Sequence, residues 1–512
     1  MPALDVAPSN LARPATASLG IRFIDLFCGA GGSSTGLVEA GYELVLAVNH
    51  WDVAVATHAA NHPDAEHWCE DIDRTDMRRL TRDADVLWAS PICVEGSPSG
   101  GKPGRRSKRA DGQIAIEELG HVEQPGFERT RATFWDVIRA TEVRAHGGRP
   151  FLAVVVENVP DLAWRWELLD LFCLCMMRFG YRMQILSASS AHLGDEEGND
   201  PAPQWRNRVY FVFTLEHLPE PDLAPRPPAW CPVCEQVVEA VQRFKPGTKR
   251  ILGQPIGKHR EQYVYICPRQ HAEVEPYVRP AASVIDWSNL GTRIGDKRKP
   301  LAASTMERIR AGLAKYPTGR TVITLNHDGH DGRAFPADTS PLPTRSTKIG
   351  EGILVPSGGT WNQDATSTTE PMRTRMANPK GFEALVTAPG AMIVEYYNHA
   401  DAEPVTSPMA TVTAQGNHHA LVVPYRNAET KPADQPLHTL ATHDSAALVR
   451  PAGEIEDCRF RMLSPREQLG AQRFPTDYRV HGNKGQQTAQ AGNAVSVNAA
   501  RFIGRRLAAI LA

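Results

Sequence analysis

The stretch "RFIDLFCGAGG", residues 22–32, decides the fold, because an apolar run passes directly into a glycine-rich turn. The following residues, "GSSTGLVEAG" (32–41), predict a helix. A strand, a glycine turn and a helix in this order are typical of α/β sheets that bind adenosine-containing cofactors. The spacing of Gly29, Gly31 and Gly32 is not G-x-G-x-x-G, and no Walker lysine follows. The turn therefore favours a cofactor without phosphates, such as S-adenosylmethionine.

Beyond this turn, residues 21–215 alternate apolar β-rich runs with helical stretches, which predicts a doubly wound sheet. The further strands are expected at 42–48, 85–90, 151–159, 183–189 and 208–213, and further helices at 52–62 and 165–180. We expect residues 1–20 to be a flexible N-terminus and residues 21–215 to form this α/β core.

Residues 216–455 are rich in proline and threonine and predict a second, β-rich domain. Four segments share a proline, a nearby threonine, a polar turn and an apolar run: 340–356, 370–389, 407–424 and 435–451. They predict repeated β-hairpins within 300–450, although a degenerate loop pattern stays an alternative. Residues 456–512 return to α/β character and are expected to complete the core.

Composition limits the class of protein. The 512 residues are 42% hydrophobic and 22% charged, with a net charge of −2, as in a globular protein. No apolar run approaches the roughly 20 residues that span a bilayer, and we recognise no signal peptide. Nine cysteines, mostly isolated, argue for a reducing compartment. We expect a cytoplasmic protein without a membrane partner.

Polar residues at the ends of two further strands extend the cofactor site. Asn49 and His50 close the second strand, where ribose hydroxyls are usually held, and Asp71 in "CEDI" could accept a hydrogen bond from an adenine amino group. Carboxyl ends of parallel strands meet at one edge of a sheet, so these residues are expected to lie beside the glycine turn.

Candidate catalytic groups also fall at strand ends. Cys93 follows the run 85–90, and Glu157 ends the run 151–159. Arg206 and Arg208 enter the last strand at alternate positions, hence on one face. Each residue alone has an ordinary structural explanation, but a thiol, a carboxyl group and two arginines beside an adenosine site indicate covalent catalysis on a heteroaromatic base.

At this point the chain resembles the cytosine-C5 DNA methyltransferase family. The matching stretches follow the order of that family: "DLFCGAGG", "SPICVEGS", "ENV", "QWRNR", "LSPREQLGAQRFP" and "QAGNAVSVNAA". The resemblance implies a Rossmann-like methyltransferase core that depends on S-adenosylmethionine, with an inserted β-rich target-recognition domain between "QWRNR" and "LSPRE".

The resemblance also implies roles. Cys93 would attack C6 of a cytosine flipped out of double-stranded DNA, and Glu157 would hold N3 and N4. Arg206 and Arg208 would contact O2 and steady the thiolate. C5 would take the methyl group of S-adenosylmethionine, after which loss of the C5 proton releases Cys93. The implied cofactor-binding residues are Asp25, Phe27, Gly29, Gly31, Gly32, His50, Asp71, Asn493 and Val495.

Two departures from the family pattern leave alternatives open. Ile92 and Val94 flank Cys93 where the family usually has proline and glutamine, and His50 stands where it usually has glutamate. His50 could accommodate a modified donor. An RNA cytosine methyltransferase, or a non-catalytic DNA-binding relative, is also compatible with the overall pattern.

A metal site is predicted in the second domain. "CPVC" supplies Cys231 and Cys234, and "CPRQH" supplies Cys267 and His271. Two such turns are typical of a structural zinc ribbon, here residues 231–271, with unligated cysteines as the alternative. A basic cluster at Lys102–Arg109 suggests contact with DNA phosphates. We expect a monomer, encoded by a bacterium or a phage, that acts on double-stranded DNA.

Overall fold

The computed structural model describes residues 17–92, 125–194, 198–301 and 459–512, a few single residues, and short strands between 321 and 449. Side chains are described from residue 132 onward in the helix that begins at Pro125. Cys93, Val94 and the basic cluster Lys102–Arg109 lie outside the described residues. Leu19, which was placed in the flexible N-terminus, donates its amide hydrogen to the Gly41 carbonyl at 2.9 Å.

A seven-stranded sheet in the order β3-β2-β1-β4-β5-β8-β6 forms the core. Neighbours from β3 to β5 run parallel, whereas β8 is antiparallel to both β5 and β6. The predicted α/β class is therefore confirmed. The strands are β1 Arg22–Leu26, β2 Glu43–Asn49, β3 Glu66–Cys69, β4 Val86–Ala89, β5 Ala153–Asn158, β6 Tyr181–Ser189 and β8 Asn207–Leu215.

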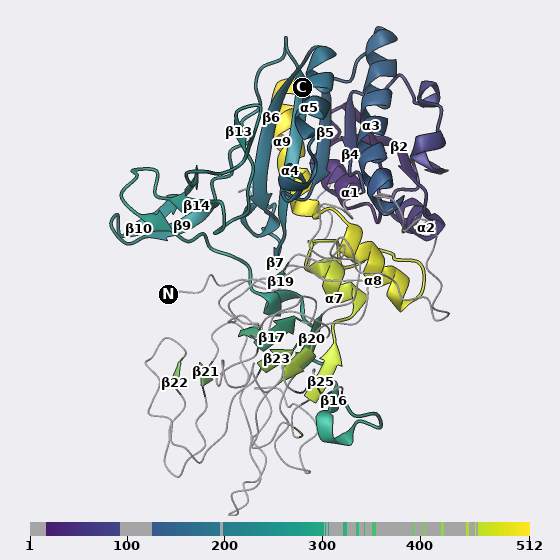
Figure 1. Ribbon diagram of the computed structural model, residues 1–512. Coiled ribbons are helices and arrows are strands. Elements are labelled where there is room, and N and C mark those ends of the chain that lie inside the picture. The colour runs from purple at the N-terminus through teal and green to yellow at the C-terminus, as the bar shows by residue number, and fades with distance from the viewer. Residues whose placement is uncertain are drawn as a thin grey trace, which may run out of the picture.

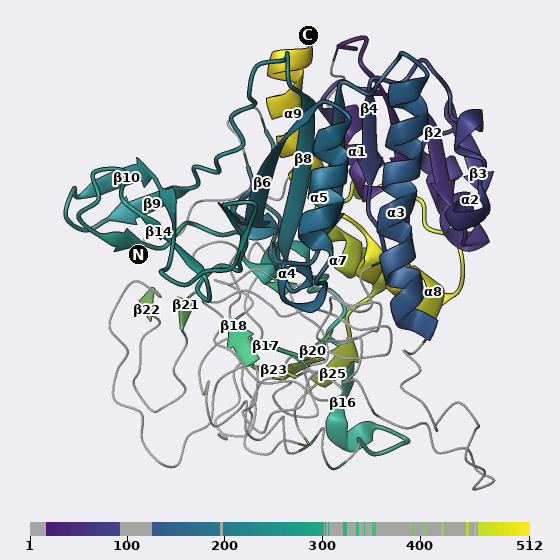
Figure 2. The same cartoon turned by 45° about the horizontal axis from the view of Figure 1, so that its top comes forward.

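Helices cover both faces of this sheet (Figure 2). The helices are α1 Gly32–Glu39, α2 Asp52–Asn61, α3 Pro125–His146, α4 Leu162–Arg165, α5 Leu169–Arg178, α7 Pro465–Gly470, α8 Lys484–Asn493 and α9 Val497–Leu511. Short 3-10 turns lie at Ile72–Arg74, Met77–Arg79, Ser190–His192, Ala281–Val284 and Ile294–Asp296. Helix α3 was not expected from the sequence.

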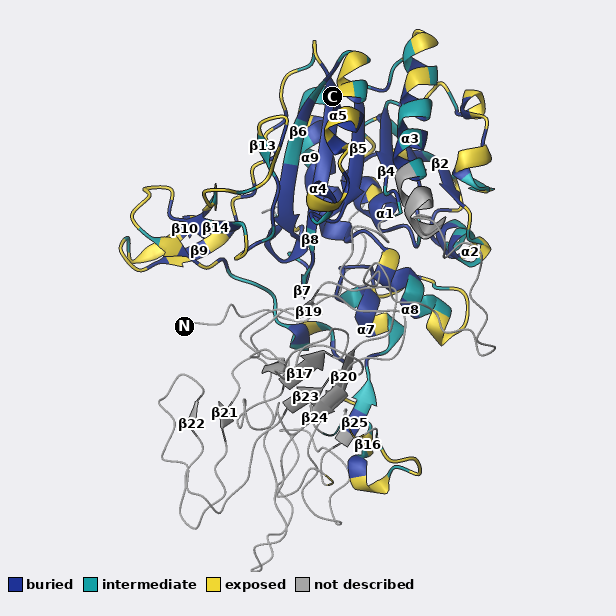
Figure 3. Cartoon of the chain, viewed as in Figure 1, coloured by how far each residue is buried: buried dark blue, intermediate teal, exposed yellow. Residues whose placement is uncertain are grey.

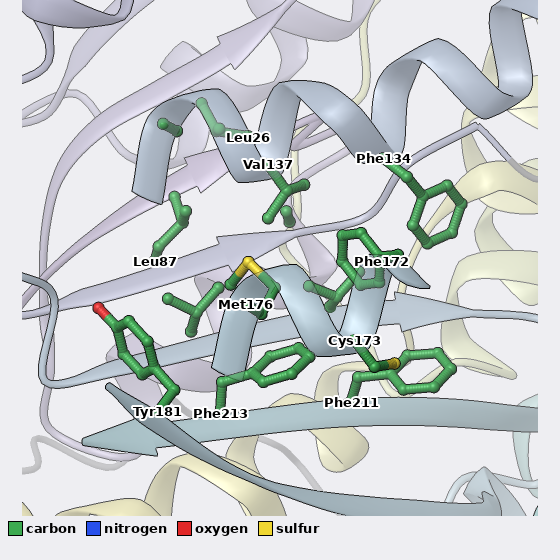
Figure 4. Packing of buried hydrophobic residues seen from close by; sticks show 14 of the residues in the cluster. Leu26, Leu87, Phe134, Val137, Phe172, Cys173, Met176, Tyr181, Phe211 and Phe213 are labelled. Atoms are coloured by element: carbon green, nitrogen blue, oxygen red, sulfur yellow. The ribbon is translucent and has the colours of Figure 1, made fainter. Parts of the chain in front are cut away.

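The core lies in two layers, one on each face of the sheet. Along β5, Val154 and Val156 pack toward α3 and α5, whereas Val155 packs toward α1 and α9. This alternation follows from the two-residue period of a strand. The first layer contains Phe134 and Phe172, whose rings pack edge to face with their centroids 5.3 Å apart (Figure 4). Strands buried on both faces read as continuous apolar runs, as "FLAVVV" does.

The last segment of the chain returns to its beginning. Helix α9 packs against α1 (Figure 1). A Cβ on Gly36 of α1 would lie 2.3 Å from the Val497 carbonyl oxygen, so only glycine allows this approach. The Tyr42 hydroxyl donates to the Gly504 carbonyl at 2.9 Å. The C-terminal residues therefore complete one layer of the core.

Residues 228–274 form a small β module on the edge strand β6 of the core. Its strands are β9 Pro228–Cys231, β10 Gln236–Glu239, β11 Val241–Phe244, β12 Arg250–Ile251, β13 Gln254–Pro255, β14 Tyr263–Ile266 and β15 Glu273–Val274. Gln254 accepts from the Ile185 amide at 2.7 Å and donates to the Met183 carbonyl at 2.8 Å. The module therefore covers an edge that would otherwise expose unpaired backbone groups.

A second sheet lies below the core in Figure 1. It has the order β16-β25-β24-β20-β17-β18, with β23 paired to β24. Its strands are β16 Thr292–Arg293, β17 Thr321–Thr324, β18 Ala334–Pro336, β20 Glu351–Leu354, β23 Leu421–Val423, β24 Ala447–Val449 and β25 Arg459–Met462. Since β25 pairs here, the C-terminal return to the core begins after Met462 rather than at residue 456.

Three of the four repeated segments supply strands β20, β23 and β24 from their apolar runs. These strands pair with one another: β20 runs parallel to β24, and β23 runs antiparallel to it. The described pairings therefore join different repeats. Strand β19, Leu342–Pro343, pairs with β7, Gln204–Trp205. This pairing attaches the lobe that contains the second sheet to the core just before Arg206. A separate pair joins β21 Met392–Ile393 and β22 Glu403–Pro404.

Burial follows this division into parts (Figure 3). The core strands β4 and β5 are buried throughout, whereas most residues of β10 and half of those of β11 in the small module are exposed. Within the described residues, no helix is long and apolar enough to cross a membrane.

Candidate active site

Several strands bring polar residues to one edge of the core sheet. Strands β1, β4 and β5 are parallel, so the segments that follow Leu26, Ala89 and Glu157 emerge side by side. Strand β8 is antiparallel, and its first residues therefore lie at the same edge, with Asn158 opposite Val209. This register brings Arg208 next to Glu157 although they are 51 positions apart in the sequence (208 minus 157).

Glu157 and Arg208 form a buried ion pair. Arg208 Nε lies 2.7 Å from Glu157 Oε1, and their side chains are only 8% and 9% exposed, respectively. Removing either charge would leave the other desolvated, which typically costs about 3–5 kcal/mol. The carboxylate is thus held in one orientation at the sheet edge, as a group that contacts a substrate must be.

Asn158 links this pair to the segment that leads to Cys93. Its side-chain amide donates to the Pro91 carbonyl at 3.1 Å, while its oxygen accepts from the Val159 amide. The Ser90 amide donates to the Leu26 carbonyl at 3.2 Å. The backbone is therefore fixed to within two residues of Cys93, which itself lies outside the described residues.

Arg206 has a different setting from Arg208. Its guanidinium donates to the carbonyl of Gly492 at 3.3 Å and to that of Ala494 at 2.5 Å. These carbonyls belong to the turn "GNAV" (492–495), in which α8 ends at Asn493 before α9 begins. Arg206 is 2% exposed, so it ties the entry of β8 to the C-terminal segment.

The glycine turn after β1 contains glycines of two kinds. Gly29 has φ +53°, and a Cβ there would meet only the Phe27 carbonyl, at 3.9 Å. A Cβ on Gly31 would lie 2.6 Å from the Tyr478 hydroxyl, and one on Gly32 would lie 1.9 Å from the Val495 carbonyl. Gly29 therefore leaves space for a ligand, whereas the other two allow close packing. This open backbone fits the predicted adenosine-containing cofactor.

Asp25 lies beneath this turn and is fully buried. In its ionised form Asp25 accepts hydrogen bonds through Oδ2 from the hydroxyls of Ser33 and Ser34, both at 2.6 Å. Burial raises the pKa of Asp25 to about 7, although these serine bonds oppose the shift. Its side chain supports the start of α1, and we assign it a supporting position under the turn in place of direct cofactor contact.

The other predicted cofactor residues surround the same edge. Phe27 is half-buried with φ +59°, a left-handed conformation that is uncommon for a residue with a Cβ. His50 is exposed after β2, and Asp71 is half-buried after β3. Val495 is 4% exposed and packs in the core layer shared by α1 and α9, while Asn493 next to it is exposed.

Three residues around the turn were not identified from the sequence: His58, His67 and Tyr478. Tyr478 donates to the Ala30 carbonyl at 2.5 Å, and the His58 ring packs against Gly31. A helix with histidines at His58 and His62, four residues apart, was the available signal, but nothing in the sequence connects α2 with this turn.

The predicted metal ligands converge in the small β module. The "CPVC" turn joins β9 to β10 and the "CPRQH" turn joins β14 to β15. Cys234 Sγ lies 3.6 Å from both Cys267 Sγ and His271 Nε2, and Cys231 Sγ lies 3.9 Å from His271 Nδ1. Zinc–sulfur bonds of about 2.3 Å in a tetrahedron give sulfur separations of roughly 3.8 Å, so the four side chains fit a zinc ion.

A backbone amide also donates a hydrogen bond to one of these cysteine sulfurs. The Cys234 amide donates to Cys231 Sγ at 3.4 Å. Burial opposes ionisation of Cys231, but the amides of Cys234 and Val233 lower its pKa overall. A lowered pKa favours the thiolate, which is the form that binds metal.

Together, the sheet with one antiparallel strand, the open glycine turn and the buried pair at the sheet edge define a Rossmann-like methyltransferase core. The chain belongs to the C-5 cytosine-specific DNA methylase family, which it matches over residues 21–258 and 343–509. The interval between the two matched parts contains the end of the small β module and the first strands of the second sheet.

Individual relatives match shorter parts. Type II methyltransferase M.AgeI of Thalassovita gelatinovora is 34% identical over 20% of this chain and 25% of its own. M.HgiGI of Herpetosiphon aurantiacus is 34% identical over 16% of this chain and 65% of its own. M.PspPI of Psychrobacter sp. is 23% identical over 63% of this chain and 68% of its own. The chain thus spans between a quarter and about two thirds of these relatives.

Proposed function

We propose that the protein transfers a methyl group from S-adenosylmethionine to C5 of cytosine in double-stranded DNA. The observation that carries this proposal is the buried Glu157–Arg208 pair, 2.7 Å apart, beside the strand end that leads to Cys93. Family membership supports the reaction class, and relatives are named Type II methyltransferases.

Each residue has a chemical task in this proposal. A flipped cytosine would present N3 and N4 to Glu157, whose orientation Arg208 fixes, and the pairing would offset charge that develops on the ring. Cys93 would add to C6, which makes C5 nucleophilic. S-adenosylmethionine would supply an electrophilic methyl group. Loss of the C5 proton and expulsion of the Cys93 sulfur would then restore the aromatic base. Arg206 would hold the "GNAV" turn against the glycine turn.

The other parts of the protein would recognise the DNA target and hold a metal ion. We assign the catalytic core to 21–215 and the C-terminal segment, and target recognition to the lobe between them, which β19 attaches at β7. Cys231, Cys234, Cys267 and His271 would hold a structural zinc ion. We further propose a monomeric cytoplasmic enzyme of a bacterium or phage.

The test is mass spectrometry of nucleosides from double-stranded DNA incubated with the protein and S-adenosylmethionine. We expect a gain of one methyl group on deoxycytidine. Cys93→Ser should abolish it, and Glu157→Gln should lower the rate about 100-fold or more, because it removes charge at the base-binding edge.

Arg226→Ala is the matched control, because Arg226 forms an exposed pair with Asp222 on the same chain and should leave the rate unchanged. A methyl group found on RNA alone, a larger adduct on cytosine, or substantial turnover by Cys93→Ser would each contradict the proposal.

A further inference from the structure

A chain of hydrogen bonds runs from beneath the glycine turn toward the surface. Ser34 Oγ lies 2.6 Å from Asp25 Oδ2 and 3.0 Å from His58 Nε2. His58 Nδ1 lies 2.8 Å from His67 Nε2, and His67 Nδ1 lies 2.9 Å from the Ala65 carbonyl oxygen. Asp25 and His58 are fully buried, whereas His67 on β3 is only half-buried.

The end of this chain determines where its protons lie. A carbonyl only accepts, so His67 Nδ1 must carry hydrogen, and Nε2 of a neutral His67 must accept. His58 Nδ1 therefore donates, and Nε2 of a neutral His58 accepts from Ser34. The single hydroxyl hydrogen of Ser34 is then used, so Asp25 can complete the chain only by being protonated and donating to Ser34.

An ionised Asp25 is compatible with the same bonds only if one histidine carries the proton instead. The intact chain thus contains one shared proton, either on Asp25 or on an imidazole. When that proton leaves, two acceptors face each other at one point among these hydrogen bonds, and one hydrogen bond is lost.

The surroundings favour the form with the proton on Asp25. Asp25 Oδ1 is buried without a hydrogen-bond partner among the described residues, which penalises the carboxylate. Burial lowers the pKa of His58 well below its usual range, and burial also lowers the pKa of His67. With the pKa of Asp25 raised by burial to about 7, the shared proton is lost near neutral pH.

The residues of this hydrogen-bond chain contact the glycine turn directly. A Cβ on Gly31 would lie 3.0 Å from His58 Cδ2, so the imidazole rests against the turn. Ser33 and Ser34, which bind Asp25, are the residues that follow the turn in α1. A change of protonation therefore acts on both sides of the turn.

Other titratable groups face this chain. His62, on α2, has its ring centroid 4.8 Å from that of His58 and its Nε2 3.1 Å from Thr35 Oγ1. The Cys28 thiol is buried near Asp25, and burial together with this carboxyl raises its pKa. Tyr478, from the C-terminal segment, packs on Gly31.

We propose that Asp25, Ser34, His58 and His67 form a single-proton relay that positions the cofactor turn and makes binding of the methyl donor depend on pH. His58 and His67 are then positioning residues. The inference rests on the proposed function only for the identity of the bound donor.

The first experiment measures histidine tautomers by nuclear magnetic resonance on the full chain labelled with ¹⁵N-histidine. At pH 6 we expect hydrogen on Nδ1 of both His58 and His67. Between pH 6 and pH 8 we expect the ¹⁵N signals of both rings to shift with one apparent pKa. Hydrogen on His58 Nε2 at pH 6, or separate titrations of the two rings, would overturn the relay, whether or not the protein binds S-adenosylmethionine.

The second experiment measures the dissociation constant of S-adenosylmethionine by calorimetry. It should rise by up to about tenfold between pH 6 and pH 8, because a single linked proton lost near pH 7 changes the affinity by at most tenfold per pH unit, and only above that pH. His67→Ala should flatten this profile, since His58 is then free to donate to Ser34. His67→Gln, which can accept from His58 and donate to the Ala65 carbonyl, should restore it.

His62→Ala is the control, because it removes a neighbouring imidazole without cutting the chain, and its profile should resemble that of the unmodified protein. A pH-independent dissociation constant, or equal flattening by His62→Ala and His67→Ala, would overturn the proposal. Absence of donor binding at every pH, with the expected tautomers present, would instead refute the proposed function.

Discussion

Gly29 and Gly32 lie three residues apart in one turn, yet the molecule uses them differently. Gly29 needs its left-handed backbone, with open space where a Cβ would stand, whereas the position of Gly32 is filled by the Val495 carbonyl. The sequence showed both as glycines of a cofactor turn. Only the return of the C-terminal segment distinguishes a glycine that leaves room for a ligand from one that permits packing.

Alanine substitutions should separate these two uses. Gly29→Ala should weaken binding of S-adenosylmethionine while changing the free energy of unfolding by only about 1 kcal/mol, the cost of a left-handed alanine. Gly32→Ala should destabilise the fold by several times as much, since its Cβ would overlap backbone. Calorimetric binding and urea unfolding provide the two readouts. Equal loss of stability in both variants would show that this distinction is wrong.

At the scale of elements, the sequence predicted the two metal-binding turns of the small β module but did not predict helix α3. Cysteine and histidine spacing predicted the ligand set of the module without knowledge of its strands. The stretch that forms α3 is rich in charge, and among its described side chains the buried face is an apolar stripe of Phe134, Val137 and Ala140 mixed with buried polar residues such as Asp136 and Arg144. Such a stripe becomes a clear helical signal only once the facing sheet is known.

The module should lose both metal and stability when one ligand is replaced. Cys234→Ser should reduce bound zinc from one equivalent to well below one and lower the melting temperature of the module, because metal binding contributes to folding. Elemental analysis and thermal unfolding measure these effects. Cys69→Ser is the control, since Cys69 is exposed and outside the quartet. Unchanged zinc in Cys234→Ser would refute the site.

At the scale of the whole molecule, a buried ion pair joins the two ends of the chain. Arg473 lies 2.6 Å from Glu39 of α1, and Arg501 of α9 lies 3.6 Å from the same carboxylate oxygen. All three side chains are at most 8% exposed. This pair, with the packing of α9 on α1, makes the C-terminal segment part of the first domain.

Breaking this pair should therefore destabilise the core. Glu39→Gln leaves two buried guanidinium groups without a counter-charge, and we expect a loss of about 3–5 kcal/mol in the free energy of unfolding. Asp222→Asn, which breaks the exposed pair with Arg226, should cost less than about 1 kcal/mol. Denaturant unfolding measures both. A loss below 1 kcal/mol for Glu39→Gln would show that the termini are held together by apolar packing alone.

The sequence by itself determined the α/β class, the positions of most core strands along the chain, the glycine turn and the cysteine–histidine quartet, because these depend on local period and spacing. The tertiary structure decided which residues meet. Register between β5 and β8 brings the Arg208 side chain into an ion pair with Glu157 and leaves Arg206 to hold the "GNAV" turn. Asp25 on β1 joins His58 and His67 through Ser34, because β1, α1, α2 and β3 pack together beneath the glycine turn. Such contacts arise from three-dimensional packing, which no spacing along a single chain specifies.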